Sequence, residues 1–299
     1  MQSSLATSVV FLRKVILILK CIDAHKKQPN PPRKCIFCAG TPISKEHVWA
    51  KWMRPYLPTG QAVQNIQEYR LGEGAQEARP GPLNRKGDAR SQKLKVVCEP
   101  CNIGWMGDLQ NLTKPVLLPL LIGERKNLSP QKQKTLVTWA TMFTMVYETC
   151  NPNHMATTPA QRATFKTEQS PPEYWIYWCA PFSDNCCPVI HIGFASHDAG
   201  FRPVANADAT QIHKAQLTLC GGGGIAFLIF STADPKAYET FAQFVTRCVS
   251  QVGYTQLWPS DGLTVRITDN RTTPLTWKDL LAFRDTFIAT LESGYNAKR

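Results

Sequence analysis

The hydrophobic pattern divides the chain into two parts that meet near residue 126. In the second part, residues 130–149 carry apolar side chains at helical spacing, and Ser129 is a typical helix cap. Asp234 and Thr276 are typical starts of two more helices, which should end near residues 252 and 291. Residues 126–299 are therefore expected to form an α+β domain with helices packed on an antiparallel sheet. β-branched and aromatic runs predict its strands at 173–179, 188–194, 215–219, 225–230 and 263–267.

The apolar run at residues 8–22 is not typical of a membrane span. Arg13, Lys14 and Lys20 interrupt it, and a helix that crosses a bilayer needs about 20 predominantly apolar residues. Residues 26–34 are rich in proline and basic side chains, as in an extended linker. We therefore expect residues 1–32 to be an apolar packing segment followed by a basic linker, and we expect no membrane partner.

Four cysteines have the spacing of a zinc site. Cys35 and Cys38 form one Cys-x-x-Cys pair, and Cys98 and Cys101 form a second. Two such pairs bind one tetrahedral Zn²⁺ through four thiolates, which leaves the ion no open position for a substrate. We therefore predict a structural zinc ion. The odd total of eleven cysteines, together with this spacing, favours a reducing, cytoplasmic compartment over a secreted disulfide protein.

Residues 33–125 are expected to form a small finger around this zinc ion. From 55 to 92 the sequence is rich in proline, glycine, glutamine and arginine, which predicts a long loop. A short strand at 93–97 should lead to the second cysteine pair, and a helix should start at Asn102. Glu46 and His47 stand at the end of the preceding strand or in the loop after it.

Positive charge is concentrated in the same part of the chain. The 299 residues carry 34 basic and 22 acidic side chains, for a net charge of +12. Residues 1–128 hold 20 of the basic and 9 of the acidic side chains. A cationic surface attracts a polyanion and releases its counterions, so DNA is the expected partner, with RNA as the alternative. The candidate phosphate contacts are Arg85, Lys86, Arg90, Lys93 and Lys95.

The finger resembles the HNH endonucleases, also called His-Me finger or ββα-metal nucleases. The likeness rests on Cys-Ile-Phe-Cys, then Glu-His-Val, then Val-Val-Cys-Glu-Pro-Cys-Asn followed by Gly-Trp-Met. It covers roughly residues 33 to 112 and points to the zinc-flanked branch that includes phage endonuclease VII. The resemblance implies a zinc-stapled ββα-metal finger ahead of the α+β domain, in an enzyme that hydrolyses phosphodiester bonds in DNA.

The resemblance also implies roles for single residues. His47 would be the general base that activates water. Glu46 and Asn102 would hold a catalytic Mg²⁺ or Mn²⁺, and Asp108 is a candidate further ligand on the helix. The chain departs from the family at Lys93, which stands near the place of the Asn that orients the catalytic His. Glu46 stands where Asp is commoner.

Two other interpretations stay open. The finger could be a non-catalytic zinc module that binds nucleic acid, or a degenerate nuclease, and Lys93 and the long 55–92 segment favour this. The 126–299 domain could also sense a ligand and gate the nuclease, as in a toxin or a phage-defence effector. The sequence indicates neither the role of this domain nor the oligomeric state.

Overall fold

An eight-stranded sheet forms the centre of the part of the chain that the structure describes. The computed structural model describes residues 33–59, 65–71, 74–75, 79–80, 89–124, 126–150, 155–197, 212–267 and 273–296. Across the sheet the strands are β11 (Thr255–Trp258), β7 (Trp175–Pro181), β10 (Ile225–Ser231), β9 (Ile212–Gly222), β8 (Val189–His197), β2 (Asn65–Leu71) and β3 (Gly74–Ala75), and β4 (Arg79–Pro80) also pairs with β2. The predicted antiparallel sheet is confirmed from β11 to β8, whereas β2 and β8 run parallel.

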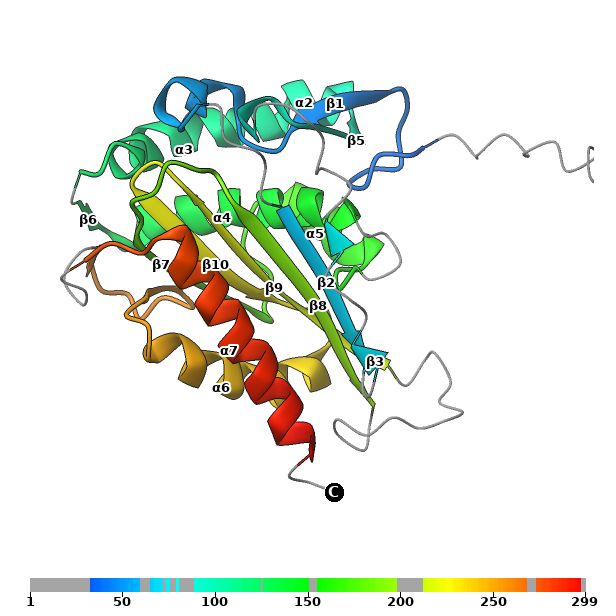
Figure 1. Ribbon diagram of the computed structural model, residues 1–299. Helices are drawn as coiled ribbons and strands as arrows, with labels where there is room; N and C mark the ends of the chain where they lie inside the picture. Colours follow the sequence, from blue (N-terminus) through cyan, green and yellow to red (C-terminus); the bar gives the residue numbers. More distant parts are fainter. Residues whose placement is uncertain are drawn as a thin grey trace, which may run out of the picture. The chain divides into compact units, whose positions relative to one another are not determined.

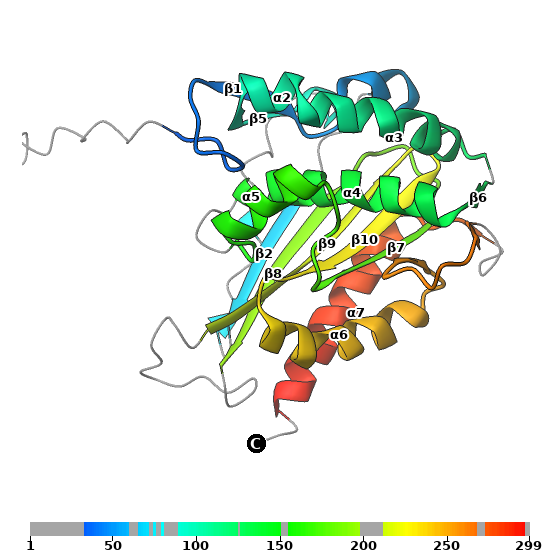
Figure 2. The same cartoon turned by 180° about the vertical axis from the view of Figure 1, so that it is seen from behind.

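Helices cover both faces of this sheet (Figure 1). α4 (Pro130–Tyr147) and α5 (Pro159–Glu168) lie on one face, and α6 (Pro235–Ser250) and α7 (Trp277–Asn296) lie on the other, as the view from behind also shows (Figure 2). Because both faces are covered, β7 and β10 are buried along almost their whole length. This double burial explains why these strands appear in the sequence as continuous apolar runs rather than alternating ones.

The predicted helix starts of the second part are confirmed. Ser129 caps α4, and its hydroxyl oxygen accepts a hydrogen bond from the backbone N–H of Lys132 at 3.5 Å. Asp234 caps α6 in the same way, and Thr276 and Asp279 exchange hydrogen bonds at the start of α7. These side chains satisfy backbone N–H groups that have no partner inside the helix, which is why the sequence marks the starts clearly.

Two short strands and two helices form the part that carries the four cysteines. β1 (Ile43–His47) pairs antiparallel with β5 (Lys93–Cys98), and α2 (Glu99–Ile103) and α3 (Trp105–Leu121) follow. The helix expected from Asn102 is thus broken at Gly104, where a Cβ atom would lie 2.6 Å from the carbonyl oxygen of Pro100. We call residues 35–38, β1, β5 and α2 together the cysteine finger.

The segment 55–92, expected as one long loop, also contains strands. It contributes β2, β3 and β4 to the central sheet, and the 3₁₀ helix η2 (Ala89–Ser91) precedes β5. Another 3₁₀ helix, η1 (Lys51–Tyr56), follows β1. The strand expected over 263–267 is shorter than predicted: only β12 (Val265–Arg266) forms, and it pairs with β6 (Asn127–Leu128) outside the central sheet.

Residues Lys34–Arg299 form one compact unit, and α3 packs against α4 within it. The expected boundary at residue 126 therefore lies inside this unit. Residues 1–32, for which a packing segment and a linker were expected, lie outside the described residues. Of the helices that the structure describes, none has the length and apolar character needed to cross a membrane.

Candidate functional site

The four cysteines of the two Cys-x-x-Cys pairs come together at one end of the cysteine finger. Their Sγ atoms all lie within 4.8 Å of one another, and Cys38 Sγ is 3.5 Å from Cys98 Sγ and 3.6 Å from Cys101 Sγ. Zinc–sulfur bonds of about 2.3 Å place the corners of a tetrahedron about 3.8 Å apart, so the cluster has the size of a zinc site. The predicted cluster is confirmed, and it could bind a structural zinc ion.

Backbone hydrogen bonds hold the first cysteine loop in place. The N–H of Ala39 donates to the carbonyl oxygen of Cys35 at 2.8 Å, and the N–H of Cys35 donates to the carbonyl oxygen of Gly40 at 3.1 Å. The N–H of Ile36 donates to the carbonyl oxygen of Val96 on β5 at 3.0 Å, which fixes the loop to the strand that delivers the second pair. These hydrogen bonds place the first pair of thiols beside the second pair.

The thiols of the cluster differ in acidity. Burial by itself raises the pKa of Cys38, but the backbone N–H of Gly40 and the neighbouring thiols outweigh it and lower the pKa to about 7. Burial raises the pKa of Cys101 to about 12. A zinc ion must therefore displace protons from the buried thiols when it binds, as is usual for thiolate sites.

The pairing of β1 with β5 separates Glu46 from His47. His47 lies directly opposite Lys93, and Glu46 lies directly opposite Leu94. Directly paired side chains share one face of a sheet, and successive residues of a strand alternate between faces. The side chains of His47 and Lys93 therefore lie on one face, which we call the outer face, and Glu46 lies on the other.

The Glu46 carboxyl group is enclosed. The residue is only 5% exposed, and its Oε1 accepts a hydrogen bond from Gln110 Nε2 on α3 at 3.2 Å. Together with His47 it lines a pocket of about 10 Å³, which apolar side chains of α4 such as Trp139 and Phe143 help to close, and such a volume holds about one water molecule. Burial raises the pKa of Glu46 from 4.5 to about 7, although hydrogen bonds from Gln110 and from the backbone N–H of His47 oppose it.

His47 has a different environment. Its side chain is half-buried, and its pKa is lowered first by burial and then by the positive charges of Lys93, Arg54 and Lys51. The imidazole is therefore neutral near pH 7, the form that a general base requires. Lys93, noted above as a departure from the HNH pattern, is exposed and faces this imidazole across the strand pair.

The other candidate ligands do not converge on one point. Asn102 on α2 donates from Nδ2 to Ser44 Oγ at 3.0 Å and so joins the helix to β1. No hydrogen bond within the described residues joins Asn102 to Glu46. Asp108 is exposed on α3. Within the described part of the chain, the four cysteines are the one group of three or more Cys, His, Asp or Glu side chains that could hold a metal ion.

The candidate phosphate contacts also differ from one another. Lys93 and Lys95 are exposed on β5. Arg90 instead donates from Nη1 to the carbonyl oxygens of Arg54, at 3.1 Å, and Leu57, at 3.5 Å, and so ties η1 to η2. Arg85 and Lys86 lie outside the described residues.

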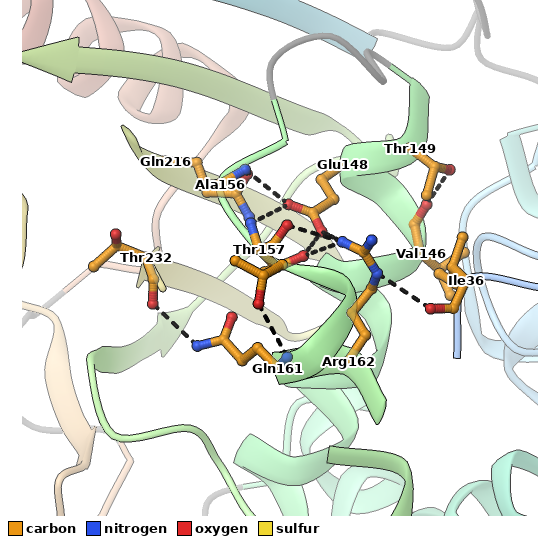
Figure 3. A network of polar contacts seen from close by, with 11 residues as sticks. Ile36, Val146, Glu148, Thr149, Ala156, Thr157, Gln161, Arg162, Gln216 and Thr232 are labelled. Atoms are coloured by element: carbon orange, nitrogen blue, oxygen red, sulfur yellow. Dashed lines mark hydrogen bonds and ion pairs between the residues drawn. The ribbon is translucent and has the colours of Figure 1, made fainter. Parts of the chain in front are cut away.

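A buried polar network fastens the cysteine finger to the helices that cover the sheet (Figure 3). Arg162 on α5 donates from Nε to the carbonyl oxygen of Ile36, at 3.2 Å, within the first cysteine loop. Its Nη1 contacts Oε1 of Glu148 at 3.4 Å, and both side chains are buried. Glu148 also accepts hydrogen bonds from the side chain and backbone of Thr157 and from the backbone of Ala156. The ion pair is thus fully enclosed and well supplied with donors.

An aromatic contact accompanies this network. Phe37, inside the same cysteine loop, packs its ring 5.0 Å from that of Trp105 and 6.4 Å from that of Phe165, which stands one turn after Arg162 on α5. The sequence marks neither Arg162 nor Gln110, because each acquires its partner from a segment far along the chain. Only the tertiary contacts identify them.

Comparison with known proteins gave no relative from which a function could be taken. No protein-family model matches the chain, and no match was found among curated proteins or among solved structures. The function therefore has to be inferred from the residues of the cysteine finger.

Proposed function

We propose that the chain is a metal-dependent endonuclease of the HNH type that hydrolyses phosphodiester bonds in DNA. The observation that carries the proposal is the order of elements in the cysteine finger: two antiparallel strands and a helix, with Glu46 and His47 at the end of the first strand and Asn102 in the helix. A four-cysteine cluster joins the strands to the helix at the opposite end. This order of elements supports the proposal, because the resemblance implies a zinc-stapled finger of two strands and a helix.

In this proposal each residue has one task. His47, neutral near pH 7, would accept a proton from the attacking water. Glu46 and Asn102 would hold a Mg²⁺ or Mn²⁺ ion, which supplies positive charge to the phosphate and to the leaving oxygen. The ligand atoms would be Oδ1 of Asn102 and a carboxylate oxygen of Glu46, whereas the present hydrogen bonds with Ser44 and Gln110 use Asn102 Nδ2 and Glu46 Oε1. The four cysteines would hold zinc and take no part in the chemistry.

A second candidate is a non-catalytic zinc module that binds nucleic acid. The burial of Glu46 favours it, because a carboxyl group 5% exposed and closed in by α4 does not face a phosphate on the surface. The basic residues of the finger would serve this function without any catalytic ion.

Plasmid cleavage separates the two candidates. We expect the zinc-loaded protein to nick or cut plasmid DNA in the presence of Mg²⁺ or Mn²⁺, and His47→Ala to reduce the rate at least about 100-fold, the usual contribution of a general base. His213→Gln, at a histidine that contacts Asp234 near the start of α6, is the matched control and should cleave as the unaltered protein does. Equal cleavage by His47→Ala would refute the catalytic role. Salt-sensitive DNA binding without cleavage would support the binding module instead.

A further inference from the structure

The outer face of the finger carries little negative charge in the part that the structure describes. Lys93 lies directly opposite His47 on this face and is exposed, and Lys95, in the irregular stretch of β5 that follows, is exposed as well. Glu46 points to the other face. The next carboxylate along β5 is Glu99, which follows the far end of the strand.

Two more cations come from η1, which begins four residues after the end of β1. Lys51 is exposed and Arg54 is half-buried, and the charges of both act on His47 together with that of Lys93. The backbone of Arg54 is held in place by the guanidinium of Arg90, which donates to its carbonyl oxygen at 3.1 Å. The positive charges of three cations from two elements therefore act on one imidazole.

These cations form no ion pair with an acidic side chain in the part of the chain that the structure describes. The ion pairs found there, such as Lys126–Glu124 and Arg162–Glu148, involve other residues than Lys51, Arg54 and Lys93. Like charges held close together repel one another, so a surface that gathers them is suited to an anionic partner. A nucleic-acid backbone offers one negative charge per phosphate at regular spacing.

We propose that Lys51, Arg54 and Lys93 form a phosphate-binding site beside His47, which holds a nucleic-acid backbone against the outer face of the finger. The proposal rests on the nucleic-acid partner of the proposed function but not on its chemistry. Arg54 presents a planar guanidinium that can donate two parallel hydrogen bonds to one phosphate, and the lysines act as point charges. Lys93, which stands near the place of the asparagine in the HNH pattern, then contacts a phosphate beside His47.

Binding to a short fluorescent DNA duplex tests this site without any cleavage. The zinc-loaded protein is titrated by fluorescence anisotropy at several salt concentrations and without Mg²⁺ or Mn²⁺. The variant Lys51→Gln/Arg54→Gln/Lys93→Gln should bind at least about 10-fold more weakly, and its slope of log K against log salt should be smaller by about 3, about one for each lost phosphate contact. Its zinc content and circular dichroism should match those of the unaltered protein.

The control removes the same charge elsewhere. Lys132→Gln/Lys134→Gln/Lys278→Gln changes three exposed lysines on α4 and α7. In this variant log K, and the slope of log K against log salt, should each change by at most about 0.5. An equal loss in the two variants would overturn the proposal, because attraction would then depend only on net charge. Absence of DNA binding at low salt would overturn it too. If the first variant alone loses binding while plasmid cleavage is absent, the phosphate site stands and the nuclease does not.

Discussion

Arg162 on α5 donates a hydrogen bond to the carbonyl oxygen of Ile36, 3.2 Å away, inside the first cysteine loop. The same guanidinium forms the buried ion pair with Glu148 at the end of α4. The loop that supplies two of the four cysteines is thus fixed to the helices that cover the sheet. The finger and the sheet should consequently gain and lose their structure together.

Loss of the Arg162 guanidinium should destabilise the whole unit. Arg162→Met leaves the buried Glu148 carboxylate without its cation, and breaking a buried pair in this way costs about 3–5 kcal/mol. Urea unfolding followed by tryptophan fluorescence measures the loss. Lys166→Met, one turn further along the same helix, is the control and should change the free energy of unfolding by at most about 0.5 kcal/mol. Adding Glu148→Gln to Arg162→Met should restore part of the stability. If Arg162→Met alone is as stable as Lys166→Met, the buried pair does not have the role given to it here.

Removal of zinc should affect both the finger and the sheet. The purified chain should contain zinc, and Cys98→Ser should abolish it because one of four thiolates is lost. Because Arg162 and Phe37 join the first cysteine loop to α5, chelation should lower the melting temperature of the whole unit in a single transition. Atomic absorption and calorimetry measure the two effects. Cys248→Ser on α6, outside the cluster, should keep its zinc; retention of zinc by Cys98→Ser would show that the cluster is not the binding site.

The enclosed Glu46 should make stability depend on pH. Its pKa is raised from 4.5 to about 7, so the native state binds the proton more tightly than the unfolded state. The resulting stabilisation is fully present below about pH 4.5 and is lost as the pH rises through 7. Glu46→Gln, whose amide resembles the protonated acid, should remove this loss, which amounts to at most about 3 kcal/mol.

Urea unfolding at acidic and at mildly alkaline pH, without divalent ions, measures the difference between the two proteins. The difference in pH dependence between the unaltered protein and Glu46→Gln reports on Glu46, because His47 is present in both proteins. If the free energies of unfolding of the two proteins change with pH in parallel, the pKa of Glu46 is not raised in the native state. Mg²⁺ added at the higher pH should stabilise the unaltered protein and leave Glu46→Gln unchanged if Glu46 is a ligand of the ion, as the proposed function requires.

Several features could be predicted from the sequence because local chemistry controls them. The helices capped by Ser129, Asp234 and Thr276 begin where the sequence places them, since a cap needs only the next few backbone N–H groups. The cysteine cluster could also be predicted, because two Cys-x-x-Cys pairs fix the local geometry of their thiols. The predictions for the strand 263–267 and the loop 55–92 were less accurate, because strands depend on partners far along the chain.

The candidate site shows the same division between local and distant causes. The sequence by itself determined which residues stand beside the cysteines, including the pair Glu46 and His47. Only the tertiary structure decided that Gln110 meets Glu46 while Asp108, on the same helix, is exposed, because the packing of α3 against the strands selects which of its faces is buried. It also decided that α4 closes over Glu46 while His47 faces the cations, since strand register and helix packing determine which face of β1 is buried.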